Sequence, residues 1–536
     1  MNSSITKKGL ASLKEYWKSD LKSGFNVSLI ALPLCLGIAI ASGFPPIAGL
    51  FAAVVGGIFV SRFNGSWITI TGPAAGLIVV NLAAIETLGG GDKVVGYPYA
   101  LAAIVVSGLF IALFGFLKLG KFGDFFPSAA VHGMLAAIGI IIMIKQFFVA
   151  AGVSAHGHEF YEIATEVPSA FLHSNPEVIF IAVISLLILI FYPKVKAKWV
   201  KMVPAPIWVL LVAIPLEFIF DFEHEHTVRT IFAGAHRVGP QLLVHLPENI
   251  LDAVQLPDFG KIATGAFWVA VVSITLVTAI ESLLSAIAVD SMDVEHRKTN
   301  LNNDLKALGF GASVSGFIGG LPMISEIVRS TANSDGGAKT QWSNFFHGVF
   351  LLIYMLIGSV VIDHIPLAAL AAMLIYTGWR LASPKEFKHM WHIGKVEFAV
   401  FVTTILIVLF TDLLIGIAAG IVLNFIILFF KKVQPANLFK VHLNSTKTGN
   451  DVVIKLKDSL TFTNYLGFKK EINKYKEYNI ALNFDEVTYV DHSVKHHLSG
   501  LKRDWEIKGL KFDRINMQNL QAINNHPLAE EVRKAV

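Results

Sequence analysis

Two pairs of polar residues that could do chemistry lie inside otherwise apolar stretches. In ESLLS, Glu281 precedes Ser285 by four residues, and in SEIVRS, Glu326 precedes Arg329 by three. Residues at these spacings share a helical face, so the first carboxylate and hydroxyl could hold a cation such as Na+, or the carboxylate could carry a proton. A structural alternative for Glu281 is a hydrogen bond that fixes the packing of a neighbouring helix. Glu326 could pair with Arg329, titrate, or bind a cation.

The composition places these residues in a membrane. Hydrophobic residues make up 54% of the 536 residues and charged residues only 15%, whereas a soluble domain carries about 25% charged residues. Ionised side chains in lipid cost several kcal/mol unless they face protein or water, which makes Glu281 a candidate functional residue. The net charge of +5 is spread over loops, so it favours membrane flanks over a nucleic-acid partner.

Apolar runs of bilayer length recur up to residue 432 and then stop. Basic short loops alternate with acidic loops, and the positive-inside rule then predicts a multi-pass protein of the inner (plasma) membrane with both termini cytoplasmic. We expect a cytoplasmic N-terminus over 1–23, a membrane domain over 24–433 and a separate tail over 439–536. The fourteen predicted spans are 26–43, 46–63, 67–86, 98–117, 126–149, 177–192, 203–220, 266–289, 303–320, 322–337, 343–361, 366–382, 397–411 and 413–430.

An internal repeat supports this count. FPSAAVHGMLAAIG at 126–139 and IPLAALAAMLIYTG at 365–378 align without gaps and share six residues, including Gly139 with Gly378. The copies are spans five and twelve, seven apart, so they must cross the membrane in opposite directions. Inverted repeats are typical of secondary transporters, and we place the two repeats at about 24–220 and 262–433.

Two corresponding spans, the third and the tenth, have broken-helix patterns. The third contains WITIT followed by Thr71, Gly72 and Pro73, which predicts an extended entry and a half-helix that begins near Pro73. The tenth contains Gly319-Gly320 and LPMI, followed by a short predicted helix from about Glu326 to Asn333. Opposed helix N-termini near the middle of the membrane would favour an anion. The alternative is a pair of kinked structural helices.

The ordered motifs LPLCLGIAIASGFPPIAGL, TGPAAG, ESLLS, PMISEIVRSTAN and GGAKTQ resemble the sulfate permease (SulP) family of anion transporters. The resemblance covers nearly the whole chain. It implies an all-α polytopic fold of two inverted seven-span repeats, in which a core domain moves against a gate domain. It also implies a homodimer, and a small inorganic anion bound between spans three and ten, with contributions from spans one and eight.

The resemblance also implies site residues. Arg329 matches a basic residue near the anion, and Glu281 with Ser285 is similar to the acidic-plus-hydroxyl pair of the sodium-dependent bicarbonate branch, so Na+ or H+ is the expected coupling cation. No other cofactor is expected. The predicted substrate-binding residues are Thr71, Gly72, Pro73, Ala74, Ser325, Glu326, Ile327 and Arg329.

Two features depart from the family pattern. Glu326 stands at the start of the span-ten helix, where a negative charge suits the helix dipole but opposes a bound anion, so we favour its pairing with Arg329. Span one carries Leu34 and Cys35 where many relatives have a polar side chain, which favours a small oxyanion. Bicarbonate and sulfate both remain open, with a weak preference for bicarbonate.

The tail alternates short apolar strands with helical stretches, a soluble α/β pattern that resembles the STAS domain of this family. Ser493 occupies a position that is phosphorylated in some relatives, but Val494 replaces the usual glycine. His492, His496 and His497 could suggest a metal, although a solvated helix face is the favoured interpretation. The EHEH sequence at 223–226 is expected to be a loop, with surface zinc binding as an alternative.

A nucleobase or dicarboxylate permease of the same architecture is the nearest alternative, since Glu281 and Glu326 could imitate paired acids that hold base edges. A membrane enzyme is disfavoured because no HExxH, GxSxG or phosphate-loop motif is evident. A membrane-anchored signalling protein that uses its tail would not need broken helices.

Overall fold

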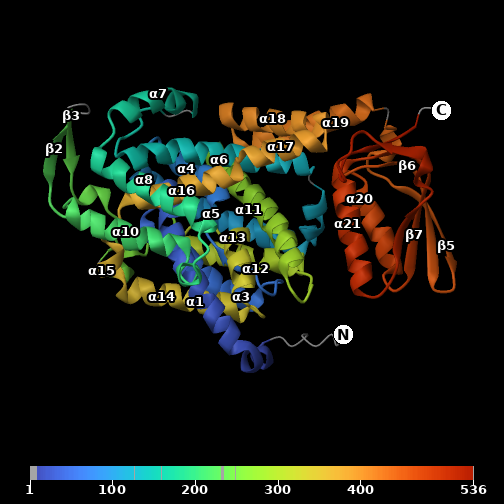
Figure 1. Ribbon diagram of the computed structural model, residues 1–536, viewed down its shortest axis with the longest axis horizontal. Helices are drawn as coiled ribbons and strands as arrows, with labels where there is room; N and C mark the ends of the chain where they lie inside the picture. The colour runs from blue at the N-terminus through green and yellow to red at the C-terminus, as the bar shows by residue number, and fades with distance from the viewer. Residues whose placement is uncertain are drawn as a thin grey trace. The chain divides into compact units, whose positions relative to one another are not determined.

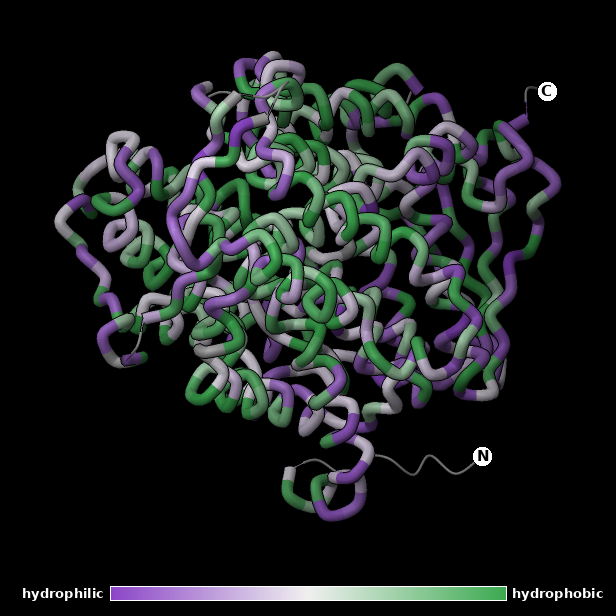
Figure 2. Tube along the Cα trace, turned by 60° about the vertical axis from the view of Figure 1, so that its left-hand side comes forward, coloured by the Kyte–Doolittle hydropathy of each residue, from purple (hydrophilic) through white to green (hydrophobic). Residues whose placement is uncertain are grey.

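The computed structural model describes residues 9–125, 127–157, 160–230, 234–247, 249–431 and 433–534. The chain divides into two compact units. The first consists of the residues up to Gly120 and of Ile138–Leu381, and the second of Lys121–Ala137 and Ala382–Val536. The first unit is mostly helical with two two-stranded sheets, whereas the second combines helices with a larger mixed sheet (Figure 1). Long hydrophobic stretches follow the helices in Figure 2.

Each predicted span coincides with a helix or with a strand followed by a helix. Among the described residues, seven helices are long and apolar enough to cross a bilayer by length and composition. In chain order the elements at the predicted spans are α1 (Leu10–Ala41), α2 (Pro46–Val55) with η1 (Gly56–Val60) and α3 (Ser61–Phe63), β1 (Ile70–Gly72) with η2 (Ala75–Leu77) and α4 (Ile78–Gly89), α5 (Lys93–Phe116), α6 (Ser128–Ala151), α8 (Pro176–Phe191), α10 (Ala205–Ile219), α11 (Gly265–Met292), α12 (Leu301–Phe317), β4 (Ile324–Glu326) with α13 (Ile327–Asp335), α14 (Trp342–Ile357) with α15 (Ser359–Ile362), α16 (Leu367–Leu381), α18 (Lys395–Phe410) and α19 (Leu413–Phe430).

Several of these helices begin at side-chain caps that the sequence supplies. The carboxylate of Asp92 accepts from Val94 N at 2.8 Å at the start of α5, and Asn175 caps α8 with Pro176 in the first turn. Such caps satisfy N–H groups that have no partner inside the helix. The connecting elements are α7 (Phe160–Leu172), α9 (Lys198–Lys201), the antiparallel hairpin of β2 (His226–Thr230) and β3 (Gly234–Val238), and α17 (Pro384–Ile393).

The C-terminal part of the second unit confirms the predicted α/β alternation. Its sheet has the strand order β5-β6-β7-β10-β9, with β8 also paired to β7, and β7 is parallel to both β6 and β8. Helices α20 and α21 pack through buried residues such as Phe468 and Trp505. The elements are β5 (His442–Thr448), β6 (Asp451–Leu460), α20 (Tyr465–Ile472), β7 (Asn479–Val490), α21 (His492–Ile507), β8 (Phe512–Ile515), β9 (Leu520–Ala522) and β10 (Glu531–Arg533).

The first helix is longer than the predicted span. It begins at Leu10, so residues 10–23, which were expected to form a separate N-terminal segment, are continuous with span one. Asp20 explains the extension, because its buried carboxylate accepts hydrogen bonds from Lys339 N at 2.7 Å and from Thr340 Oγ1 at 2.5 Å. These bonds hold the start of α1 against the segment that follows α13.

The two repeat copies recognised in the sequence meet in the structure. A Cβ added to Gly378 on α16 would lie 2.6 Å from the carbonyl oxygen of Gly139 on α6. Gly139 and Gly378 are equivalent positions of the repeat, and contact between equivalent positions is expected near the axis that relates two repeats. The contact supports the prediction of an inverted repeat.

We predict that Gly378→Ala destabilises the protein, because its new methyl group meets backbone and the two helices must move apart. Overpacking of this kind costs about 1–3 kcal/mol, so the unfolding temperature in detergent should fall. Gly265→Ala at the start of α11 is the matched control, since an added Cβ there meets nothing within 4 Å. Equal unfolding temperatures for Gly378→Ala and the wild type would contradict the contact between α6 and α16.

Candidate functional site

The broken spans meet in a two-stranded sheet. Strands β1 and β4 are antiparallel, with Ile70 opposite Glu326, Thr71 opposite Ser325, and Gly72 opposite Ile324. Each strand leads into a helix. After β1, η2 begins at Ala75, two residues later than the predicted start, and α4 continues from Ile78. After β4, α13 begins at Ile327, one residue later than predicted. We call the region formed by these strands and the first turns of the following helices the paired-strand site.

Arg329 is the central charged side chain of the paired-strand site. It is only 1% exposed, and its Nη2 donates a hydrogen bond to the carbonyl oxygen of Pro73. Its Nη1 donates to Sγ of Cys35 on α1 at 3.4 Å. A Cβ on Gly72 would lie 2.7 Å from Nη1, so the absence of a side chain at Gly72 makes room for the guanidinium. Arg329 thus links α13 to spans one and three.

Glu326 pairs with Arg329, which confirms the favoured prediction. Its carboxylate caps α13 by accepting from the backbone N–H of Arg329 at 2.8 Å, and the same oxygen lies 3.6 Å from Nε of Arg329. The acid is therefore compensated by the helix N-terminus and by the guanidinium. A guanidinium has five N–H donors, and the described residues accept from only Nη1 and Nη2.

Glu281 lies against the first turn after β1. It is 6% exposed, and a Cβ on Gly76 would lie 1.6 Å from its Oε1. Its Oε2 has no hydrogen-bond partner among the described residues. This finding disfavours the structural alternative in which Glu281 is hydrogen-bonded to a neighbouring helix. Ser285 is also buried on α11, which contacts β4 and η2.

The hydroxyls of Thr71 and Ser325 have protein partners. Asn344 Nδ2 donates to Oγ1 of Thr71 at 3.2 Å, and Ser325 Oγ donates to Asp304 Oδ2 at 3.0 Å. Both hydroxyls are fully buried. Pro73 and Ala74 connect β1 to η2, so the predicted substrate-binding residues offer chiefly backbone groups and the guanidinium of Arg329.

Three residues of this site were not predicted from the sequence: Asp304, Asn344 and Ser330. Ser330 accepts a hydrogen bond from Ile70 N at 2.8 Å and so supports the strand pair. Asp304 could have been found, because it is an ionisable residue inside predicted span nine. Asn344 and Ser330 gave no comparable signal, because polar uncharged residues are common at helix ends.

Ser493 belongs to the second unit and not to the paired-strand site. It is 7% exposed, near the start of α21, and Ser128 N donates to its hydroxyl at 3.3 Å. The interpretation of the nearby histidines as a solvated helix face is wrong for His492, which is buried and whose Nδ1 lies 2.9 Å from the carbonyl oxygen of Leu528. Burial lowers the pKa of His492 to about 4. His496 is exposed, and His497 stacks on Tyr465.

Many apolar spans, two of them broken at one buried site, define the class of multi-pass membrane proteins with a transporter-type centre. Residues 17–404 match the model of the sulfate permease family, and the chain belongs to this family of anion transporters.

Relatives and solved structures agree with this assignment. The chain is 29% identical to a putative sulfate transporter, YvdB of Bacillus subtilis, over 80% of this chain and 76% of that protein. It is 26% identical to the bicarbonate transporter BicA of Picosynechococcus sp., over 75% of this chain and 69% of the relative.

Two solved structures share the fold. The transmembrane domain of a cyanobacterial bicarbonate transporter BicA matches with a TM-score of 0.64 and 25% identity, covering 76% of this chain and 97% of that one. The murine anion transporter Slc26a9 in the inward-facing state matches with a TM-score of 0.66 and 15% identity, over 96% of this chain and 90% of that one. The second match extends the likeness in fold to most of the C-terminal region.

We predict that Gly72→Ala weakens anion binding without unfolding the protein. The new methyl group meets the end of the Arg329 side chain and not backbone, so the guanidinium must shift. We expect the half-saturating concentration of the transported anion to rise roughly tenfold, equivalent to about 1.4 kcal/mol. Gly500→Ala, with open space at its Cβ, is the control. An unchanged half-saturating concentration in Gly72→Ala would show that the position of Arg329 does not matter for the anion.

Proposed function

We propose that the protein is a secondary active transporter of a small inorganic oxyanion, bicarbonate or sulfate, coupled to Na+ or H+. The observation that carries the proposal is the buried guanidinium of Arg329 between two paired broken spans. Membership of the sulfate permease family supports an inorganic anion as the substrate. The likeness to bicarbonate and sulfate transporters supports both candidate anions.

In this proposal the anion lies beside the first turns of η2 and α13. The N–H groups of a helix start and a partly unsatisfied guanidinium both favour negative charge. Glu326 does not repel the anion strongly, because Arg329 and the start of α13 already compensate it. Apolar Leu34 and the thiol of Cys35 add few polar contacts on span one, which suits a small oxyanion.

Glu281 is the proposed coupling residue. Its carboxylate lies against η2, and Oε2 has no hydrogen-bond partner in the described part of the chain, so a proton or Na+ could satisfy it. Binding of the cation would remove a negative charge next to the anion site, and the two ligands would therefore favour each other. Ser285, one turn further along α11, is the proposed second oxygen ligand for Na+.

Alternating access, membrane orientation and assembly are part of the same proposal. The core containing the paired-strand site would move against a gate domain, both termini would be cytoplasmic, and the protein would act as a homodimer. A nucleobase permease is the competing function, but the pairing of Glu326 with Arg329 occupies one of the two acids it would need.

Uptake into proteoliposomes tests the substrate class. Labelled bicarbonate, sulfate and uracil are offered in separate experiments, each with and without a Na+ or proton gradient. We expect saturable uptake of at least one oxyanion, stimulated by one gradient, and no uptake of uracil. Uptake of uracil without either oxyanion would overturn the proposal.

We predict that Glu281→Gln abolishes gradient dependence while leaving the protein folded. Glutamine has nearly the same shape as glutamate, but its amide does not take up a proton near neutral pH and carries no charge to hold Na+. The measurement is oxyanion uptake as a function of the imposed gradient, with Glu477→Gln on the exposed surface of the tail as the control. Gradient dependence equal to the wild type would rule out Glu281 as the coupling residue.

A further inference from the structure

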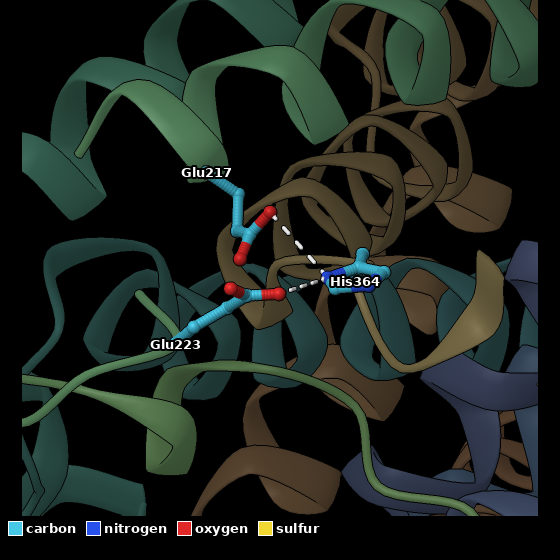
Figure 3. A group of neighbouring side chains, drawn as sticks. All are labelled: Glu217, Glu223 and His364. Carbon is cyan, nitrogen blue, oxygen red and sulfur yellow. Dashed lines mark ion pairs between the residues drawn. The ribbon is translucent and has the colours of Figure 1, made fainter. Parts of the chain in front are cut away.

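A cluster of two acids and a histidine lies in the first unit, apart from the residues of the paired-strand site. Glu217 stands near the end of α10, Glu223 in the turn that follows, and His364 just before α16 (Figure 3). Nδ1 of His364 lies 3.3 Å from an oxygen of Glu223 and 3.7 Å from an oxygen of Glu217. One ligand atom from each residue lies within 4.8 Å of the other two.

Glu217 is the unusual member of this cluster. Its side chain is fully buried, and neither carboxylate oxygen has a hydrogen-bond partner among the described residues. Figure 3 shows its carboxylate directed at His364. A buried carboxylate without hydrogen bonds costs several kcal/mol unless a positive charge compensates it. The one basic group paired with either acid in the described residues is the imidazole of His364, which cannot balance two carboxylates.

Local structure fixes the backbone at Glu217 and the position of the His364 ring before any ligand binds. Buried Phe222 closes the turn after α10 by donating its N–H to the carbonyl oxygen of Glu217 at 3.2 Å. The segment that carries His364 is held by backbone bonding of Val244 N to Ile365 O at 3.0 Å. The ring of His364 also packs on Phe218, with the ring centroids 4.7 Å apart. A rigid set of ligands loses little entropy when a cation binds.

We propose that Glu217, Glu223 and His364 bind a divalent transition-metal cation of the Zn2+ type. Imidazole nitrogen and carboxylate oxygen are ligands of Zn2+ at about 2.0–2.2 Å, which places the ligands of a tetrahedral site about 3.3–3.6 Å apart. The separations of 3.3 and 3.7 Å from His364 are close to this range. Three protein ligands leave one position for water. The cation connects the end of α10 in the first repeat to the start of α16 in the second.

Calorimetric titration of the full-length protein in detergent tests the site. The protein is first stripped with a chelator and then titrated at neutral pH with Zn2+ and, separately, with Mg2+. We expect one saturable Zn2+ site and much weaker binding of Mg2+, because imidazole favours Zn2+. Glu217→Gln, Glu223→Gln and His364→Asn should each raise the Zn2+ dissociation constant at least tenfold. Transport is not part of the measurement, so its result is independent of the proposed function.

His224→Asn is the matched control, because His224 lies in the same turn but its Nδ1 is 2.7 Å from Asp221 and outside the cluster. Added Zn2+ should raise the unfolding temperature of the wild type and of His224→Asn, but not that of Glu223→Gln. Glu223→Gln is used here because the side chain of Glu223 is partly exposed, so its replacement should not prevent folding. Any one of four results would overturn the proposal. These are the absence of saturable Zn2+ binding, equal binding of Zn2+ and Mg2+, unchanged Zn2+ affinity in all three cluster variants, and loss of Zn2+ binding in His224→Asn.

Discussion

Backbone hydrogen bonding inside a membrane is the constraint on which this structure depends. Lipid supplies no partner for peptide groups, so any non-helical segment at membrane depth must find its partners within the protein. Spans three and ten both contain such a segment. The two segments are strands β1 and β4, whose peptide groups pair with each other. The pairing brings two distant parts of the sequence into contact and leaves two helix starts, at Ala75 and Ile327, inside the protein. The candidate anion site follows from that arrangement.

Arg329 and Glu326 compensate each other's charge at the paired-strand site. The buried guanidinium of Arg329 donates to the carbonyl oxygen of Pro73 and pairs with the carboxylate of Glu326. These two partners do not use all of its N–H donors. Oε2 of Glu281 has no hydrogen-bond partner among the described residues, and neither has Oδ1 of Asp304. In the proposed function, an acid without a compensating partner next to a compensated base would allow an anion and a cation to bind together.

Local patterns allowed much of this arrangement to be predicted. Composition and apolar runs predicted the spans, and Gly and Pro residues ahead of the half-helices predicted the broken helices. The i, i+3 spacing predicted the pairing of Glu326 with Arg329. Contacts between distant segments could not be predicted in this way: those of Asp304 with Ser325 and of Cys35 with Arg329 depend on which helix faces which. The helical continuation of α1 before residue 24 was missed because its lysines indicated a soluble segment, while the partners of Asp20 lie far along the chain.

The strand pair also bears on how the protein is made. Strand β1 belongs to the first half of the chain and its partner β4 to the second, so β1 leaves the ribosome long before β4 exists. During that interval the peptide groups of Ile70 and Thr71 lack the partners they have in the finished protein. A segment of this kind cannot rest stably in lipid, and it must stay hydrated or in contact with the insertion machinery until the second half arrives. The fold therefore delays the final placement of span three until the second half of the chain has been made.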